Sequence, residues 1–465
     1  MQFIHLVAIV AYFCYSSVST YLTHIFTFTM TTSHDNTNNS SMFPSLSPKL
    51  AFLLVSFFLG QLGDGLNIFQ GIYLVRSMNW NEGSVGAALS LMGLTALIVQ
   101  PFAGDWVDKA TVHRRVFLVV ASLVTAMSAS TILHVHKQNI GEYLLQDHVL
   151  IYASKVTEGI ASSFIGPCLA ALTLASFGPH QFDAVMASNL FWGHVGSVVA
   201  AVLAGFVAYM SYPDIKYCFL VIGASALVAV AVVPSLPEGD PRMGRGFAAA
   251  VETKKEETSF LESATTTHNK TNSTTIVRSN SPVSVSETSK LIESKSDLKD
   301  TNNNDDDEPT ASSYLEVFLD SKTCILSLTG FFFHFANANV LLVLGELMGG
   351  GDADESTRSV IPLTAGAIVT AQFTMAIATW VGASLTDKGA GRKPLFMACL
   401  MTLPLRCAMI IWLLSSGHEH LLLSTQIFDG IGGGLFALIH PYLVADITFG
   451  TGRFNVVSKY YSILL

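Results

Sequence analysis

Polar and ionisable residues recur inside four otherwise apolar stretches of this sequence. In chain order they are Gln61, Asp64, Asn67, Gln70, Lys155, Glu158, His334, Asn337, Asn339, Gln426, Asp429 and His440. The first four follow one another at intervals of three residues, which places them on one slowly drifting stripe of a helix. Charged groups in a membrane-like environment are costly and mark pathways for substrates, ions or protons. These residue types therefore predict binding of a small polar solute together with exchange of protons.

Lys155 and Glu158 leave two interpretations open. Three residues apart on one helix, they either contribute to a pathway or pair with each other and only offset the cost of burial. Asp64 has no basic residue in its own stretch, so it is the stronger candidate for taking up a proton on one side of a membrane and releasing it on the other. The predicted substrate or proton pathway consists of Gln61, Asp64, Asn67, Lys155, Glu158, His334, Asn337 and Asp429.

The elements that must position these residues are membrane-spanning helices. Half of the 465 residues are hydrophobic, 13% are charged, and the mean hydropathy is +0.48. A transmembrane helix needs about 20 apolar residues. Ten runs near this length are present, at 50–75, 84–104, 116–133, 149–175, 184–210, 217–233, 322–347, 361–385, 394–414 and 420–445. The sequence thus predicts an all-α polytopic membrane protein with about ten transmembrane helices.

Basic residues are distributed unevenly between the short connections of the two sides. Eight lie on one side, namely Lys49, Lys109, Arg114, Arg115, Lys388, Arg392, Lys393 and Arg453. Four lie on the other side, namely Arg76, Lys137, Lys216 and Arg358. The positive-inside rule therefore places the first side in the cytosol. The stretch 236–313, rich in Ser, Thr, Asn and charged residues, then predicts a disordered cytosolic linker.

Two polar stretches follow the second and the eighth apolar run and share a pattern. They are AGDWVDKATVHRR at 103–115 and GASLTDKGAGRK at 382–393. Each combines a small residue, an Asp, a Lys and a basic pair, here Gly104, Asp108, Lys109, Arg114 and Arg115, and Gly382, Asp387, Lys388, Arg392 and Lys393. A second repeat relates KVTEGIASS, which contains Glu158, to QIFDGIGGG, which contains Asp429. Both repeats indicate a duplicated chain, with the polar stretches as tight charged hairpins between helices.

The two polar stretches resemble the cytosolic motif G-x-L-A-D-R-x-G-R-K that follows helices 2 and 8 in the major facilitator superfamily. Lys155 and Gly159 similarly resemble the R-x-x-x-G motif of helix 4, with Lys in the place of Arg. The resemblance implies two pseudo-repeated halves around a central cavity lined by helices 1, 4, 7 and 10, the four that carry the polar residues. It also implies that Asp108 and Asp387 each cap the N-terminus of a helix in the opposite half and so latch the cytosolic side.

Four regions follow from this organisation. They are an N-terminal segment (1–49), an N-terminal six-helix half (50–235), the linker (236–313) and a C-terminal half with four helices (314–465). The segment 1–49 reads as a targeting piece, an extra helix or an over-extended start. The superfamily resemblance implies twelve helices, of which about ten are present. We therefore expect the 465-residue chain to be incomplete and not to transport by itself.

Enzymatic chemistry is not predicted. The six cysteines stand singly, and no stretch matches a nucleophile elbow, a phosphate loop or a metal-binding helix. No cofactor or metal is expected. The sequence predicts an integral, multi-pass membrane protein that moves a small solute with protons by alternating access. Its expected partners are the solute, protons and the lipid bilayer, not nucleic acid. The alternative is a non-transporting, transporter-like receptor or scaffold that signals through the central linker.

Overall fold

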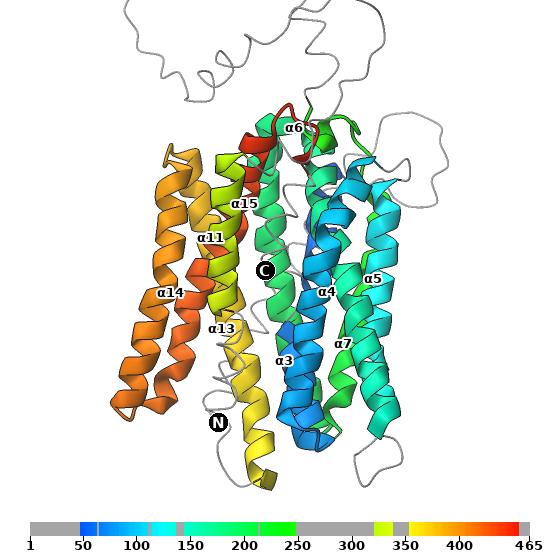
Figure 1. Cartoon of the computed structure of the whole chain (residues 1–465), viewed down its shortest axis with the longest axis vertical. Helices are drawn as coiled ribbons and strands as arrows, with labels where there is room; N and C mark the ends of the chain where they lie inside the picture. Colours follow the sequence, from blue (N-terminus) through cyan, green and yellow to red (C-terminus); the bar gives the residue numbers. More distant parts are fainter. Residues whose placement is uncertain are drawn as a thin grey trace, which may run out of the picture. The chain divides into compact units, whose positions relative to one another are not determined.

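The computed structural model shows a bundle of helices (Figure 1) and describes residues 47–62, 65–109, 113–135, 144–212, 214–247, 320–337 and 353–454. All regular structure in these ranges is helical. The longer helices are α2 (Pro48–Gly60), α3 (Gly65–Ile72), α4 (Glu82–Lys109), α5 (Arg114–Ser130), α6 (Leu144–Met210), α7 (Leu220–Val232), α11 (Ser321–Asn337), α13 (Ala353–Asp387), α14 (Arg392–Ser415) and α15 (Gln426–Thr448). Short 3-10 and π segments are η1 (Tyr73–Ser77), η2 (Thr131–His134), η3 (Ile215–Phe219), η4 (Val233–Ser235), η5 (Met243–Arg245) and η6 (Glu419–Thr425).

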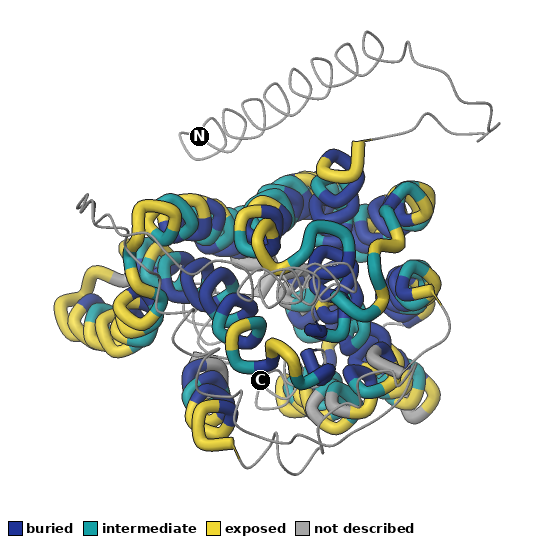
Figure 2. The backbone as a smooth tube through the Cα atoms, turned by 90° about the horizontal axis from the view of Figure 1, so that it is seen from above, coloured by how far each residue is buried: buried dark blue, intermediate teal, exposed yellow. Residues whose placement is uncertain are grey.

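The outer surface of the helices suits a lipid environment. Within the described residues, seven helices are long and apolar enough to cross a membrane, and α2 and the start of α11 are shorter apolar helices. Large apolar side chains are exposed on several of them, including Phe102 at 71%, Met127 at 70% and Trp380 at 66%. Figure 2 shows the exposed positions on the outward sides of the helices and the buried positions facing their neighbours. The total of ten spans stays a prediction, because parts of the predicted spans lie outside the described residues.

The first predicted span, 50–75, is not one continuous helix. α2 ends at Gly60 and α3 begins at Gly65, after which η1 continues as a π-helix to Ser77. The intervening sequence GQLGDG has three glycines, each of which disfavours a helix interior by about 1 kcal/mol. The expectation of an unbroken helix is therefore wrong, and the break begins at Gln61.

α6 contains two helices that meet at Gly178, as predicted from the separate runs 149–175 and 184–210. Gly178 has a φ of 70°, a left-handed conformation that glycine adopts without steric cost, and Pro179 follows it. Proline at the start of a helix sacrifices no hydrogen bond, since the first amides have no helical partner. The first arm of α6 comprises residues 144–177, and the second arm comprises residues 179–210.

The charged stretches were expected to form hairpin turns directly after the apolar runs, and this is wrong for their first residues. α4 continues through Asp105 and Asp108 to Lys109, and α13 continues to Asp387. No Gly or Pro lies between Asp105 and Lys109, so nothing in the sequence stops the helix there. The second stretch turns only at Gly389, whose φ is 88°.

The two copies of the acidic repeat pack in the same way on neighbouring helices. Gly159 lies so close to α4 that a Cβ atom there would sit 2.6 Å from the Met92 carbonyl oxygen. A Cβ atom on Gly430 would sit 2.6 Å from the Ala371 carbonyl oxygen of α13. The neighbouring Thr95 and Thr374 each bond the carbonyl four residues earlier, at 2.7 Å. Small residues thus allow close helix contact in both copies.

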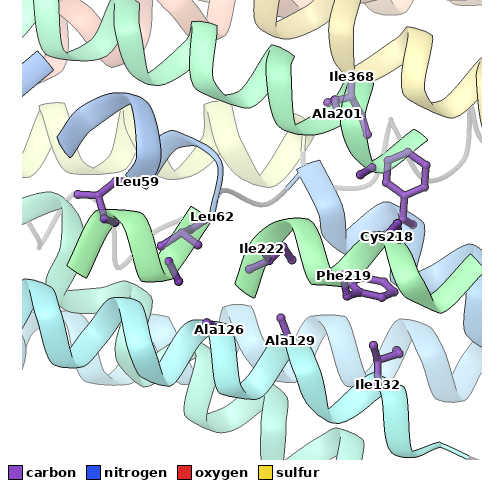
Figure 3. Close-up of a cluster of buried hydrophobic side chains, with 14 of the residues drawn as sticks. Leu59, Leu62, Ala126, Ala129, Ile132, Ala201, Cys218, Phe219, Ile222 and Ile368 are labelled. Atoms are coloured by element: carbon purple, nitrogen blue, oxygen red, sulfur yellow. The ribbon is translucent and has the colours of Figure 1, made fainter. Parts of the chain in front are cut away.

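The largest buried apolar cluster joins helices from distant parts of the sequence. It contains Leu59 of α2, Ile222 of α7 and Ala201 of the second arm of α6. Ile368 of α13 belongs to the same cluster and lies beside Ala201 (Figure 3). We call the described residues up to 247 the N-terminal part and those from 320 onward the C-terminal part. The two parts therefore pack directly against each other.

Candidate functional site

Three of the predicted pathway residues meet in one buried cluster of the N-terminal part. The Lys155 ammonium donates to Asn67 Oδ1 at 2.7 Å and to Glu158 Oε2 at 2.8 Å. The side chains of Lys155 and Glu158 are 1% and 9% exposed. Asn67 stands on α3, whereas the ion pair stands on the first arm of α6. The cluster therefore connects the helix after the α2–α3 break to the helix carrying both charges.

The buried ion pair has a definite energetic consequence. Removing one partner of such a pair costs about 3–5 kcal/mol, because the remaining charge stays in a low-dielectric interior. Asn67 adds a charge-assisted hydrogen bond to the ammonium, and such bonds are stronger than those between neutral groups. The structure thus forms the pairing that the three-residue spacing allowed. A pairing of this kind does not decide between a structural role and a pathway role.

A second buried ion pair lies in the C-terminal part and was only half predicted. Arg406 of α14 donates from Nη1 to Asp429 Oδ1 at 2.8 Å and from Nη2 to Gln426 Oε1 at 3.3 Å. The Arg406 side chain is buried, with 1% exposure, and that of Asp429 is nearly buried, with 10% exposure. The sequence predicted a pathway role for Asp429 but none for Arg406. An Arg midway along an apolar run needs a counter-charge, and that signal could have identified the pair.

The two ion pairs occupy related places in the repeats. Glu158 and Asp429 are the equivalent acids of KVTEGIASS and QIFDGIGGG. The position of Lys155 is occupied by Gln426 in the second copy, and the cation comes from Arg406 on another helix instead. Each part of the chain thus keeps one acid and one cation buried together, although the repeats no longer share the same basic residue.

The other predicted pathway residues are not brought into these clusters. Gln61 is 5% exposed, and its Oε1 accepts from Ser225 Oγ of α7 at 2.5 Å. Asp64 lies outside the described residues. His334 and Asn337 belong to α11, but their side chains are not described. The predicted pathway through all of these residues therefore stays a prediction.

The motif after α13 forms a direct contact between the two parts. Arg392 at the start of α14 donates from Nη2 to Asp183 Oδ2 of the second arm of α6 at 2.5 Å, and it also pairs with Asp446. The Tyr442 hydroxyl donates to the Asp183 carbonyl oxygen at 2.7 Å. The guanidinium also lies over the Tyr442 ring, 5.2 Å from its centroid. Arg392 thus joins α14 and α15 to the arm that follows Gly178.

The motif after α4 has its own contact with the C-terminal part. Arg453 pairs with Asp105 at 3.3 Å, so Asp105 is more than a solvated surface charge. The basic pair of this motif, Arg114 and Arg115, bonds to the segment after α7. Arg114, 9% exposed, donates to the Pro241 carbonyl, and Arg115 donates to the Pro234 carbonyl.

The remaining motif residues differ in their burial. Gly104 and Gly382 are buried, whereas Asp387, Lys388 and Lys393 are exposed. The side chains of Asp108 and Lys109 are not described. The predicted helix-capping role of Asp108 therefore stays untested. Among the motif residues that the structure describes, Arg392 bonds across this side to Asp183.

A repeated F-G-x-x-x-F pattern, which the sequence analysis missed, follows the first arm of α6 and also α15. It begins at Phe177 in the first copy and at Phe449 in the second. The last aromatic residues of the two copies, Phe182 and Phe454, meet edge to face with ring centroids 5.8 Å apart. Equivalent residues of the two copies thus contact each other beside the Arg392 and Arg453 bonds.

A hollow of about 280 Å³ lies elsewhere, on the surface formed by α4, α5 and the first arm of α6. Apolar side chains line it, among them the mutually packed aromatic rings of Trp106, Phe117 and Phe164. Because Trp106 is 61% exposed on a face suited to lipid, this hollow does not provide the polar contacts that a hydrophilic solute needs. Among the described residues, no group of three or more His, Cys, Asp and Glu side chains could hold a metal ion.

The helical bundle and its apolar exterior define a multi-pass membrane protein. Residues 50–448 match the family model described as Major Facilitator Superfamily, and the chain belongs to that family. An uncharacterized MFS-type transporter of Mycobacterium tuberculosis is 28% identical over 405 residues, which cover 87% of this chain and 79% of the relative. As a member of a family of carriers, the protein is not an enzyme.

Solved structures of the same fold include transporters. A proton:xylose symporter has a TM-score of 0.56 at 14% identity, over 90% of this chain and 87% of that chain. A nucleoside transporter has a TM-score of 0.52 at 13% identity, over 90% of this chain and 89% of that chain. At these identities the likeness establishes the fold alone.

Proposed function

We propose that the protein is a secondary active transporter that moves a small polar solute together with protons by alternating access. The buried cluster of Asn67, Lys155 and Glu158 is the observation that supports this proposal most directly. The cluster offers a cation, an acid and an amide, which together can bind a polar solute. Ionisable groups inside membrane helices serve such pathways by default.

The contacts between the two parts supply the conformational side of the proposal. Two ion pairs lie on the side predicted to be cytosolic. Arg392 holds the start of α14 to Asp183 of the second arm of α6, and Arg453, just after α15, holds to Asp105 near the end of α4. For a central site to open toward that side, these ion pairs must separate. Alternating access then consists of making and breaking these contacts around a fixed binding site.

Proton coupling is assigned to Asp64, as the sequence predicts. A neutral amide at this position can still bind a solute but cannot carry a proton. Asp64→Asn should therefore abolish accumulation of the solute against its gradient while sparing exchange of solute across the membrane. The measurement is uptake into liposomes containing the protein, screened over metabolites with and without an imposed pH gradient. The likeness to a proton:xylose symporter makes sugars a sensible first set of metabolites.

Unchanged accumulation by Asp64→Asn would remove Asp64 from the mechanism. The alternative function, a transporter-like receptor or scaffold, predicts a different outcome. In that case neither Asp64→Asn nor loss of the Lys155–Glu158 pair would alter signalling through the linker, and no metabolite would be taken up.

A further inference from the structure

A polar contact inside the apolar region joins the second arm of α6 to α13. His194 Nδ1 lies 2.8 Å from Gln372 Oε1. The two residues are 178 positions apart in the sequence, and they belong to the N-terminal and C-terminal parts. Neither residue belongs to the predicted pathway or to the charged motifs.

On the α6 side, the contact stands on an arm that is fixed to α2. The Ser197 hydroxyl donates to the Gly60 carbonyl oxygen at 2.8 Å. A Cβ atom on Gly196 would overlap the Phe57 carbonyl oxygen, and one on Gly60 would overlap the Gly193 carbonyl oxygen, so the two helices pack backbone to backbone here. His194 is displaced by about 100° around the helix from Gly193, and so it points away from this seam toward α13.

On the α13 side, the contact stands on a helix that is fixed to α15. Ala371 and Thr374 form the close contact with Gly430. Gln372, next to Ala371 in the sequence, lies about 100° around α13 from it and reaches His194. The hydrogen bond therefore connects two seams that each hold a different part of the chain together. Any separation of the second arm of α6 from α13 has to break it.

The geometry also sets the chemistry of the imidazole. An amide oxygen can only accept, so Nδ1 carries the hydrogen and Nε2 of the neutral ring holds a lone pair. Nε2 is buried and has no hydrogen-bond partner among the residues that the structure describes. A proton on Nε2 would create a buried N–H on a charged ring with no acceptor there, which is costly in a low-dielectric interior.

Among the residues that the structure describes, no charged group on the packed elements adjoins the ring to offset that cost. α2 has Lys49 as its one ionisable residue, at the far end of the helix. In α13 the ionisable residues are Asp354, Glu355, Arg358 and Asp387, all near its ends. On α15, Asp429 is paired with Arg406 and Asp446 with Arg392, while His440 stacks on Phe436. Along α6 the others are Asp147, His148, Lys155, Glu158, His180 and Asp183, with Lys155 and Glu158 paired to each other.

We infer that His194 is a proton-binding positioning residue that links the separation of α6 and α13 to pH. With a neutral ring, the bond to Gln372 holds the two helices together. When the helices separate, water reaches Nε2, which then accepts a proton from the aqueous side and has solvent as its hydrogen-bond acceptor. Because the proton binds the separated arrangement better, low pH shifts the population toward it. This inference rests on the proposed alternating access but not on a particular solute or on Asp64.

The test measures the distance between the two parts as a function of pH. Spin labels are placed on cysteines at Met210 and Ser416, both exposed, in a background without the native cysteines. The protein in lipid nanodiscs is measured by pulsed electron paramagnetic resonance at pH 8 and pH 5. The expected result is a second distance population that grows as the pH falls.

His194→Gln retains a polar side chain but cannot titrate in this range, and it should remove the pH-dependent growth of the second population. Gln372→Leu should remove the bond and raise the second population at pH 8 by about threefold, the effect of a typical polar contact between membrane helices. His180→Gln, an exposed histidine at the bend of α6, is the control and should respond to pH like the parent protein.

A pH response that persists in His194→Gln, or no response in the parent protein, would overturn the inference. The outcome is separable from that of the uptake screen. A response that depends on His194, without uptake of any metabolite, would refute the proposed transport and leave the proton link. Proton-driven uptake without a distance response would support the proposed transport and refute the proton link at His194.

Discussion

At the scale of single residues, the main feature of this protein is two ion pairs inside its helices. Lys155 with Glu158 and Arg406 with Asp429 each place an acid and a cation together with little exposure. Buried pairs of this kind often add little net stability, yet losing one partner is expensive. Each pair can therefore be tested by comparing single substitutions with the neutral double substitution.

Arg406→Leu removes the cation that faces Asp429 and should lower the free energy of unfolding by about 3–5 kcal/mol. The double variant Arg406→Leu with Asp429→Leu leaves no buried charge at the site and should recover most of that loss. Equilibrium unfolding in detergent micelles measures both. If the single variant is as stable as the parent protein, the pair contributes no structural constraint.

The residue scale also shows which parts of the site a sequence can reveal. The spacing of Lys155 and Glu158 made their pairing a possibility that the structure realises, because both lie on one helix. The partner of Asp429 was missed because Arg406 lies 23 positions away on a different helix. Periodicity along one helix carries no information about which face of a neighbouring helix it meets.

At the scale of elements, glycines decide how closely the helices approach. Gly430→Ala should lower the free energy of unfolding by about 1–3 kcal/mol, since its Cβ atom would press on the backbone of α13. Gly159→Ala should do the same against α4. Gly223→Ala is the matched control, because a Cβ atom there meets nothing within 4 Å, and it should be neutral or slightly stabilising.

Equal stability of Gly430→Ala and Gly223→Ala in thermal unfolding would show that the close packing of the repeated segments does not matter. The same repeat was readable from the sequence as EGI and DGI. The helix boundaries were less readable. The first predicted span breaks after Gly60 because glycines interrupt its apolar run. α4 continues through Asp105, although the residues there are polar, because no glycine or proline stops the helix.

At the scale of the whole molecule, membership of the Major Facilitator Superfamily agrees with the all-helical, multi-pass membrane protein that length, hydropathy and the two polar stretches at 103–115 and 382–393 predicted. The contacts between the two parts could not be predicted in the same way. Asp183 and Arg392 are 209 positions apart, and no pattern within either stretch names the other. The repeated F-G-x-x-x-F pattern, had it been noticed, would have indicated equivalent surfaces that meet.

The orientation of the molecule in its membrane follows from the eight-to-four bias of basic residues. Cysteines introduced at Thr111 and Gly389 should resist an impermeant thiol reagent in intact cells, because both motif stretches are predicted to face the cytosol. A cysteine at Asn139 should react. Labelling of both motif stretches from outside would contradict the predicted orientation.

Uptake by the double variant Lys155→Met with Glu158→Leu tests the central claim most directly, because the variant removes both charges without leaving one unpaired. It should fold, as judged by a melting temperature close to that of the parent protein. If the cluster binds solute, the variant should lose pH-driven uptake into liposomes by at least about tenfold, the equivalent of 1.4 kcal/mol. Uptake equal to that of the parent protein would show that the cluster is structural and that transport depends on other residues.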